Sequence, residues 1–333
     1  MKNKRNILYA NIREIGLIAV IILLSFFVQY RSGGSFITAE NINDILVETA
    51  VLAILSVGMM MVIITGGIDL SIGATMALAG MIGTTVLKNN QNLNPLIIIF
   101  IAVLVGALCG LINGLLVARL NVLPIIATLG MMNVYRGITY LVSRGSWVLQ
   151  SDMSKEFMAI ATNRFLGINN LIWITIIIYC IGYWFMNYTR KGRQIYAVGN
   201  SMESAKVSGI KTKSVLVMVY TLMGLIAGLG GILYVCKYAA SQGETATGYE
   251  MNVIAACVLG GVSISGGVGK VQGVLLGALL FGALNNALPL MHISPFFQEA
   301  LRGLIILLSI IINAVIQRRV TKKSLERRSE NEQ

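Results

Sequence analysis

Several polar or charged residues lie in or beside long apolar stretches of this sequence, and four of them are the strongest candidates for function: Asp69, Asn113, Arg136 and Asn285. Burying such groups is costly, so they usually face a partner or a water-filled path. We take these four residues as candidates for a translocation path, and hydrogen bonds between helices are the alternative.

The sequence supplies no catalytic constellation. Its one histidine, His292, has no visible catalytic partner, and its four cysteines have no metal spacing. Gly269-Lys270 looks like the end of a phosphate loop, but that motif also needs Gly at 264 and Ser or Thr at 271. The chain has Ile264 and Val271 there. We therefore expect no enzyme activity, metal or cofactor, and any ATP site must lie in another chain.

Residues 189–213 are too polar to cross a membrane. Asn200 or Ser201 can cap a helix, with Glu203 near its positive end and Gly209 as its stop. A helix of about seven residues is marginal alone and needs something to dock against. This pattern favours an interface with a soluble cytoplasmic partner, and a solvated basic loop is the alternative.

The composition identifies the elements that position these residues. Hydrophobic residues make up 56% of the 333 residues, and charged residues make up 12%, against about 25% in soluble domains. Soluble enzymes, disordered chains and nucleic-acid binders are excluded. Continuous apolar runs of this length predict an all-α bundle of about ten transmembrane helices. The predicted spans are 15–30, 46–65, 71–87, 95–117, 122–143, 169–188, 214–235, 251–265, 271–290 and 296–317.

The basic residues predict an orientation. With the N-terminus inside, 18 of the 26 Lys and Arg residues fall on the inner side of the ten crossings, and six fall outside. The first run has no cleavage site and is expected to remain as a helix. We predict one transmembrane domain, 1–333, with cytoplasmic tails at 1–14 and 318–333 and a cytoplasmic loop at 189–213. The net charge of +12 thus reflects topology and not a nucleic-acid partner.

Glycines mark both packing faces and breaks. Gly106, Gly110 and Gly114 recur every four residues, as do Gly269, Gly273 and Gly277, which predicts close helix contacts. Gly-rich segments at 66–73 and 260–267 interrupt apolar runs. Each is either a break that lines a cavity or a tight turn at the membrane surface.

Several motifs resemble one family. They are Gly67–Gly73, Ala127–Gly130 with Tyr135–Gly137, Gly192-Arg193 with Tyr196–Asn200, Ser208–Ile210, and Ile254–Gly261 with Gly266-Gly267. Over residues 15–317 the chain resembles the membrane-spanning permease subunits of ATP-binding-cassette importers for simple sugars, which include ribose, xylose, galactose, rhamnose and autoinducer-2 permeases.

The resemblance implies a division of labour. Two permease subunits, identical or different, would form a dimer around the path, embedded in the lipid of the bacterial plasma (inner) membrane. A binding protein would deliver sugar to the outer face. Loop 144–168 is the candidate docking site for that binding protein. Cytoplasmic ATPases would bind the loop at 189–213, which is then the coupling loop between ATPase and permease. The implied coupling residues are Gly199, Asn200, Glu203, Ser204, Ala205, Lys206 and Gly209. The family usually shows Asn-Pro-x-Ala-Ala here, but this chain has Ser-Met-Glu-Ser-Ala after Gly199-Asn200.

Two other classes of function compete with this one. A stand-alone ion-coupled carrier or channel would need no ATPase, but the spans lack the several carboxylates of a proton relay. A membrane-embedded enzyme would need a catalytic constellation that the sequence does not show.

Overall fold

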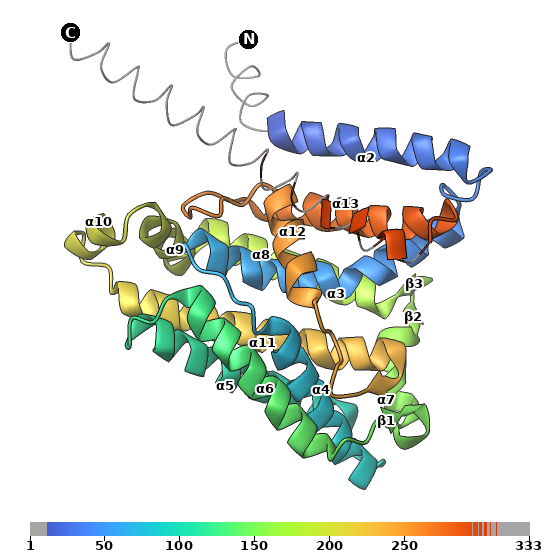
Figure 1. The fold of residues 1–333 in the computed structure, drawn as a ribbon, viewed down its shortest axis with the longest axis horizontal. Helices are drawn as coiled ribbons and strands as arrows, with labels where there is room; N and C mark the ends of the chain where they lie inside the picture. Colours follow the sequence, from blue (N-terminus) through green and yellow to red (C-terminus); the bar gives the residue numbers. More distant parts are fainter. Residues whose placement is uncertain are drawn as a thin grey trace.

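Helices form nearly all of the regular structure in the described part of the chain (Figure 1). The computed structural model describes residues 12–294 together with 296–298, 300–301, 303–304, 307 and 311. The helices are α2 (Ile12–Arg31), α3 (Ala39–Ile64), α4 (Ile72–Asn89), α5 (Pro95–Ala118), α6 (Pro124–Ser143), α7 (Lys155–Thr162), α8 (Asn170–Tyr188), α9 (Arg190–Asn200), α10 (Met202–Val207), α11 (Thr212–Tyr238), α12 (Tyr249–Leu259) and α13 (Val271–Leu290).

Seven helices in this part of the chain are long and apolar enough to cross a membrane: α2, α3, α5, α6, α8, α11 and α13. The all-helical prediction is confirmed. The eighteen-residue α4 is rich in small residues and almost wholly buried among other helices. The predicted last span, 296–317, falls largely outside the described residues, as do the 1–14 and 318–333 tails.

The predicted span 251–265 is wrong in its extent. Helix α12 has 11 residues and ends at Leu259. Gly260 and Gly261 then turn the chain, and Gly261 adopts a φ of +98°, which favours glycine. Apolar composition alone had extended this span, because Val262 and Ile264 continue the apolar pattern through the turn.

Helix α3 forms the centre of the bundle. Every residue from Thr49 to Ile64 is buried, and the helix contacts α8, α11, α12 and α13. It begins at Ala39, seven residues before the predicted span, where the Thr38 hydroxyl accepts a hydrogen bond from the Asn41 amide at 3.2 Å. The polar residues of its first turns had hidden this start.

The glycine faces pack helices together as predicted. A Cβ on Gly106 would overlap the Gly224 carbonyl of α11, and one on Gly110 would overlap the carbonyl of Tyr220. On α13, Gly277 lies equally close to the backbone of α12, and Gly273 lies equally close to Gly260, which directly follows α12. Gly269 differs, because it precedes α13 and contacts the Ile64 side chain.

The two ends of the bundle carry different structures (Figure 1). Helices α9 and α10 lie at one end, and α7 lies at the other with the short strands β1 (Val148–Leu149), β2 (Arg164–Phe165) and β3 (Ile168–Asn169). Strand β1 pairs antiparallel with β4 (Ala240–Ser241), with Val148 opposite Ser241. This pairing joins the loop after α6 to the segment after α11.

Candidate functional site

Helix α9 is an amphipathic helix that follows the last turn of α8. The Thr189 hydroxyl caps it by accepting a hydrogen bond from the Gly192 amide at 3.0 Å. Its buried residues Gly192, Ile195 and Val198 recur every three positions and form one face. Basic residues in the first turn of the helix are exposed: Arg190, Lys191 and Arg193. The sequence analysis predicts no helix in this part of the 189–213 loop, and that prediction is wrong for Arg190–Asn200.

Helix α10 matches the predicted short helix. The Ser201 hydroxyl accepts a hydrogen bond from the Ser204 amide at 3.2 Å, and Glu203 lies in the first turn. Gly209, with a φ of +79°, follows the helix end. Val207 is 90% exposed, an unusual position for an aliphatic side chain outside the membrane-spanning helices. The helix therefore presents both an acidic and an apolar group to its surroundings.

The seven predicted coupling residues divide into two groups. Five are exposed and available to a partner: Asn200, Glu203, Ser204, Lys206 and Gly209. Ala205 is buried, and Gly199 is half-buried. These two pack inward, so they support the element from within the protein.

Gly199 joins α9 to the two glycine-rich segments. A Cβ at this position would overlap the Ile64 carbonyl at the end of α3. The Gly267 amide donates a hydrogen bond to that same carbonyl at 2.8 Å, and the Tyr196 hydroxyl donates to the Gly269 carbonyl, also at 2.8 Å. One junction thus connects α9, the end of α3 and the turn before α13.

A cavity of about 820 Å³ opens beside this junction. The glycine-rich turn after α3 lines one wall with Thr65, Gly66 and Gly67, while Glu203 and Lys206 of α10 line another. Two of the seven predicted coupling residues, Glu203 and Lys206, therefore share a cavity with the first glycine-rich break.

Asp69 and Asn113 lie together in a buried polar network. Asp69 is 2% exposed, and its Oδ1 accepts hydrogen bonds from the Ser71 amide at 2.9 Å and the Ser71 hydroxyl at 2.7 Å. The side-chain amide of Asn113 donates to the Ser71 hydroxyl oxygen at 2.8 Å and to Asp69 Oδ2 at 3.4 Å. Tyr135 Oη lies 3.2 Å from Asn113 Oδ1. The network links the α3–α4 turn to α5 and α6, and a path role for the pair stays a prediction.

Arg136 lies apart from that network. Its guanidinium donates hydrogen bonds to the carbonyls of Gly243 at 2.7 Å and Thr245 at 2.8 Å. These contacts hold the segment between β4 and α12 against α6. Asn285 lies in a third place, where it lines a cavity among α3, α11, α12 and α13. The structure thus brings two of the four predicted path residues together and separates the other two.

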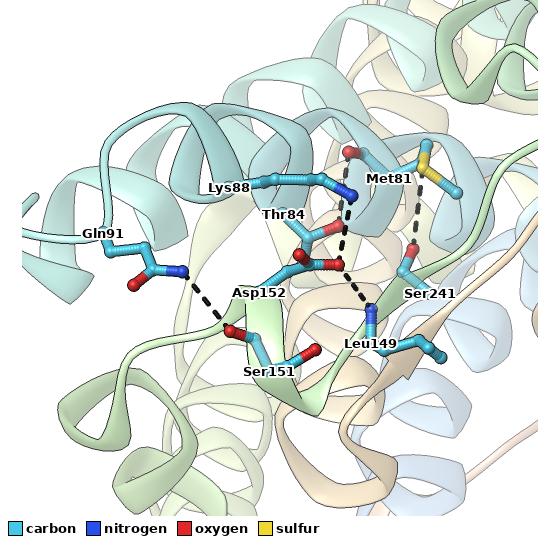
Figure 2. Close-up of polar contacts among 8 residues, drawn as sticks. All are labelled: Met81, Thr84, Lys88, Gln91, Leu149, Ser151, Asp152 and Ser241. Carbon is cyan, nitrogen blue, oxygen red and sulfur yellow. Dashed lines mark hydrogen bonds and ion pairs between the residues drawn. The ribbon is translucent and has the colours of Figure 1, made fainter.

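The loop at 144–168 is anchored to α4 (Figure 2). Lys88 Nζ lies 3.1 Å from Asp152 Oδ2, which also accepts a hydrogen bond from the Leu149 amide at 3.1 Å. The hydrogen bond from the Leu149 amide has the larger effect on the Asp152 carboxylate, and the hydrogen bond from Lys88 adds to it. Together they hold the pKa of Asp152 below its ordinary value. Gln91 adds a hydrogen bond to the Ser151 carbonyl at 3.4 Å. The loop is thereby positioned at the end of the bundle opposite α9 and α10.

Sequence reasoning missed several residues of these sites. Tyr135 and Ser71 were noted only within motifs, yet both belong to the Asp69 network. Asn252, which shares the cavity of Asn285, was not singled out. Its position in the first turn of the predicted 251–265 span was the available signal.

Known proteins match nearly the whole chain. The family model described as "Branched-chain amino acid transport system / permease component" matches residues 41–310. The ribose import permease protein RbsC of Escherichia coli K12 is 37% identical over 299 residues, which cover 89% of this chain and 92% of that protein. RbsC of Bacillus subtilis 168 is 34% identical, covering 90% and 91% of the two chains.

A further relative carries a different sugar in its name. The L-arabinose ABC transporter permease protein AraH of Azospirillum brasilense is 32% identical, covering 89% of this chain and 86% of its own. No solved structure matches the chain significantly. The family and the apolar helices indicate a multi-pass protein of the bacterial inner membrane. The chain belongs to the family of transport-system permease components, whose members are transport subunits.

Proposed function

We propose that this chain forms the translocation path of an ATP-binding-cassette importer for a simple sugar. The named relatives are a ribose import permease and an L-arabinose ABC transporter permease. The observation that carries the proposal for this chain is the α9–α10 element, which is capped at both helix starts and exposes Glu203 and Val207. An ATP-driven transport subunit without a phosphate loop of its own needs such a docking element for its ATPase.

The proposed topology has about ten crossings with both ends of the chain in the cytoplasm. Six of the basic residues belong to segment 189–213, which includes α9 and α10. The positive-inside rule therefore assigns that end of the bundle to the cytoplasm. The buried α4 and the short α12 would complete the crossings together with the predicted last span, 296–317.

The proposed transport cycle uses three further partners. A cytoplasmic ATPase would grip α10, a second permease subunit would complete the path, and a binding protein would dock at loop 144–168. Closure of the ATPase would displace α10, and the Gly199 junction would transmit this displacement to the ends of α3 and α13. Access would then alternate between the two sides. Asp69, Asn113, Arg136 and Asn285 remain the proposed path residues.

Site-directed cross-linking tests the docking assignment. In a Cys180→Ala background, Val207→Cys should cross-link to a candidate ATPase of the same organism when the two are co-expressed. Phe165→Cys, at the opposite end of the bundle, is the matched control, since Phe165 is also well exposed. A cross-link to Phe165→Cys instead of Val207→Cys would contradict the proposed docking face.

A further inference from the structure

A second cavity, of about 500 Å³, lies among α3, α11, α12 and α13. Its walls carry polar and aromatic side chains, which include Glu48, Tyr238, Tyr249, Asn252, Asn285 and Asn286. Glu48 lies nine residues into α3, or about 14 Å along the helix axis. Because the other end of α3 contacts α9, this cavity lies in the half of the bundle away from the α9–α10 element.

Two amides in this cavity have no hydrogen-bond partner among the described residues. These are Asn252 and Asn285, both half-buried. Their neighbour Asn286 differs, because it exchanges two hydrogen bonds with Asn41, at 3.0 and 3.1 Å. Unpaired amides between helices are costly, so Asn252 and Asn285 need water or a polar ligand in the cavity.

The charged groups at the cavity wall compensate each other. Glu48 forms an ion pair with Lys237 at 2.8 Å and accepts a hydrogen bond from the Tyr238 hydroxyl at 3.0 Å. The Lys237 ammonium also lies 4.7 Å from the centre of the Tyr238 ring. An ionic ligand would therefore find no unpaired charge among these residues.

Tyrosine rings cluster on the same side of the cavity. The Tyr234 ring centre lies 4.5 Å from that of Tyr238 and 5.8 Å from that of Tyr249. Such contacts fix the rings, and the lining Tyr238 and Tyr249 thus provide a preformed wall of apolar faces with polar edges.

We propose that this cavity is a sugar-binding subsite within the permease, with Asn252 and Asn285 as the residues that contact sugar hydroxyls. An amide offers two donors and an acceptor, which complement a hydroxyl that both donates and accepts. The cavity volume falls within the usual range of about 300–1,000 Å³ for small-molecule sites. An apolar occupant would leave both amides unpaired. This assignment rests on the proposed function.

The test uses the complete importer in proteoliposomes, with the permease, its ATPase and its binding protein. Sugar imported per ATP hydrolysed is measured for ribose, arabinose and galactose. Asn252→Leu and Asn285→Leu remove the amides at similar volume and should each lower this ratio about tenfold, roughly the effect of a lost ligand hydrogen bond. ATP hydrolysis is measured in the same vesicles, so a lower ratio reports sugar handling by the permease and not loss of the ATPase.

Asn187→Leu is the matched control. Asn187 is exposed on α8, far from the cavity residues in the fold, and its amide donates only to the Tyr183 carbonyl of its own helix. The ratio of sugar imported to ATP hydrolysed should stay within about twofold of the wild-type ratio in this variant. Asn285→Ser replaces the amide with a hydroxyl that can both donate and accept a hydrogen bond. Its ratio of sugar imported to ATP hydrolysed should fall between those of the wild type and Asn285→Leu. It also replaces Asn285→Leu in the test if that variant fails to assemble.

The outcomes separate the two proposals. If the wild type imports sugar, and the assembled Asn252 and Asn285 variants show the same ratio of sugar to ATP and the same sugar preference, the subsite alone is overturned. Absence of ATP-driven sugar import by the wild type would overturn the proposed function and the subsite with it.

Discussion

Gly199 lies so close to Ile64 that a side-chain carbon at position 199 would overlap the Ile64 carbonyl oxygen. That carbonyl also accepts the hydrogen bond from Gly267. The contact joins α9, a helix outside the membrane spans, to the end of α3 and to the turn before α13. It gives the proposed coupling element a rigid connection to the bundle.

Gly199→Ala should loosen this junction. The added Cβ would force α9 away from α3, and overpacking of this kind typically costs about 1–3 kcal/mol. We expect a lower unfolding temperature in detergent and a lower ATP-driven uptake. Gly137→Ala is the control, because nothing lies within 4 Å of its added Cβ. If both variants behave alike, the junction has no special role.

Gly110→Ala should separate α5 from α11. The new Cβ would overlap the Tyr220 carbonyl, and neither backbone can yield without moving its helix. The expected loss of stability is again about 1–3 kcal/mol, measured by thermal unfolding of the purified protein. Gly130→Ala, with open space around its Cβ, should be neutral or slightly stabilising. A stable Gly110→Ala protein would contradict the described packing.

Glu203→Lys should weaken ATPase binding while the permease stays folded and inserted. Glu203 is exposed, so the reversed charge disturbs a partner's surface and the helix start more than the core. The measurement is co-purification of the ATPase. Glu156→Lys places the same change in the first turn of α7, at the opposite end, and should leave co-purification unchanged. Equal co-purification by Glu203→Lys and wild type would show that the docking assignment is wrong.

Asp69→Ala should destabilise the buried network. It leaves the Ser71 and Asn113 donors without their acceptor, at a cost of about 1–3 kcal/mol. A double-mutant cycle with Asn113→Ala should give a non-additive change in unfolding free energy, since the two side chains interact directly. Additive effects would mean that the pair contributes independently and that the network is not a unit.

The Asp152 anchor should depend on pH. Because the folded-state pKa of Asp152 lies below the ordinary 3.8, its stabilisation of the loop is full above that value and is lost as pH falls below it. Hydrogen exchange at the Leu149 amide, corrected for intrinsic rates, should show less protection at low pH. Asp152→Asn should remove this pH dependence. Protection that falls equally in the variant would contradict the role of the carboxylate.

Local signals predicted some elements closely. The continuous apolar run at 271–290 predicted α13, whose bounds agree with that span. Ser201 and Gly209 predicted the ends of α10, because caps and stops depend on neighbouring residues. Helix α9 was missed, because its buried face shows only Gly192, Ile195 and Val198 among basic residues.

Tertiary relationships could not be predicted in this way. Asp69 and Asn113 are 44 residues apart, and only the packing of α5 against the α3–α4 turn brings them together. Arg136 and the Gly243 carbonyl are 107 residues apart, and no spacing rule joins them. Residue types predicted which side chains need partners, and the fold determined which partners they have.

Reconstituted transport tests the central claim most directly. The purified chain is placed in proteoliposomes alone, or with its ATPase and binding protein, and sugar uptake is measured with ATP or with an imposed ion gradient. We expect uptake only in the complete assembly and only with ATP. Uptake by the chain alone, driven by an ion gradient, would contradict it.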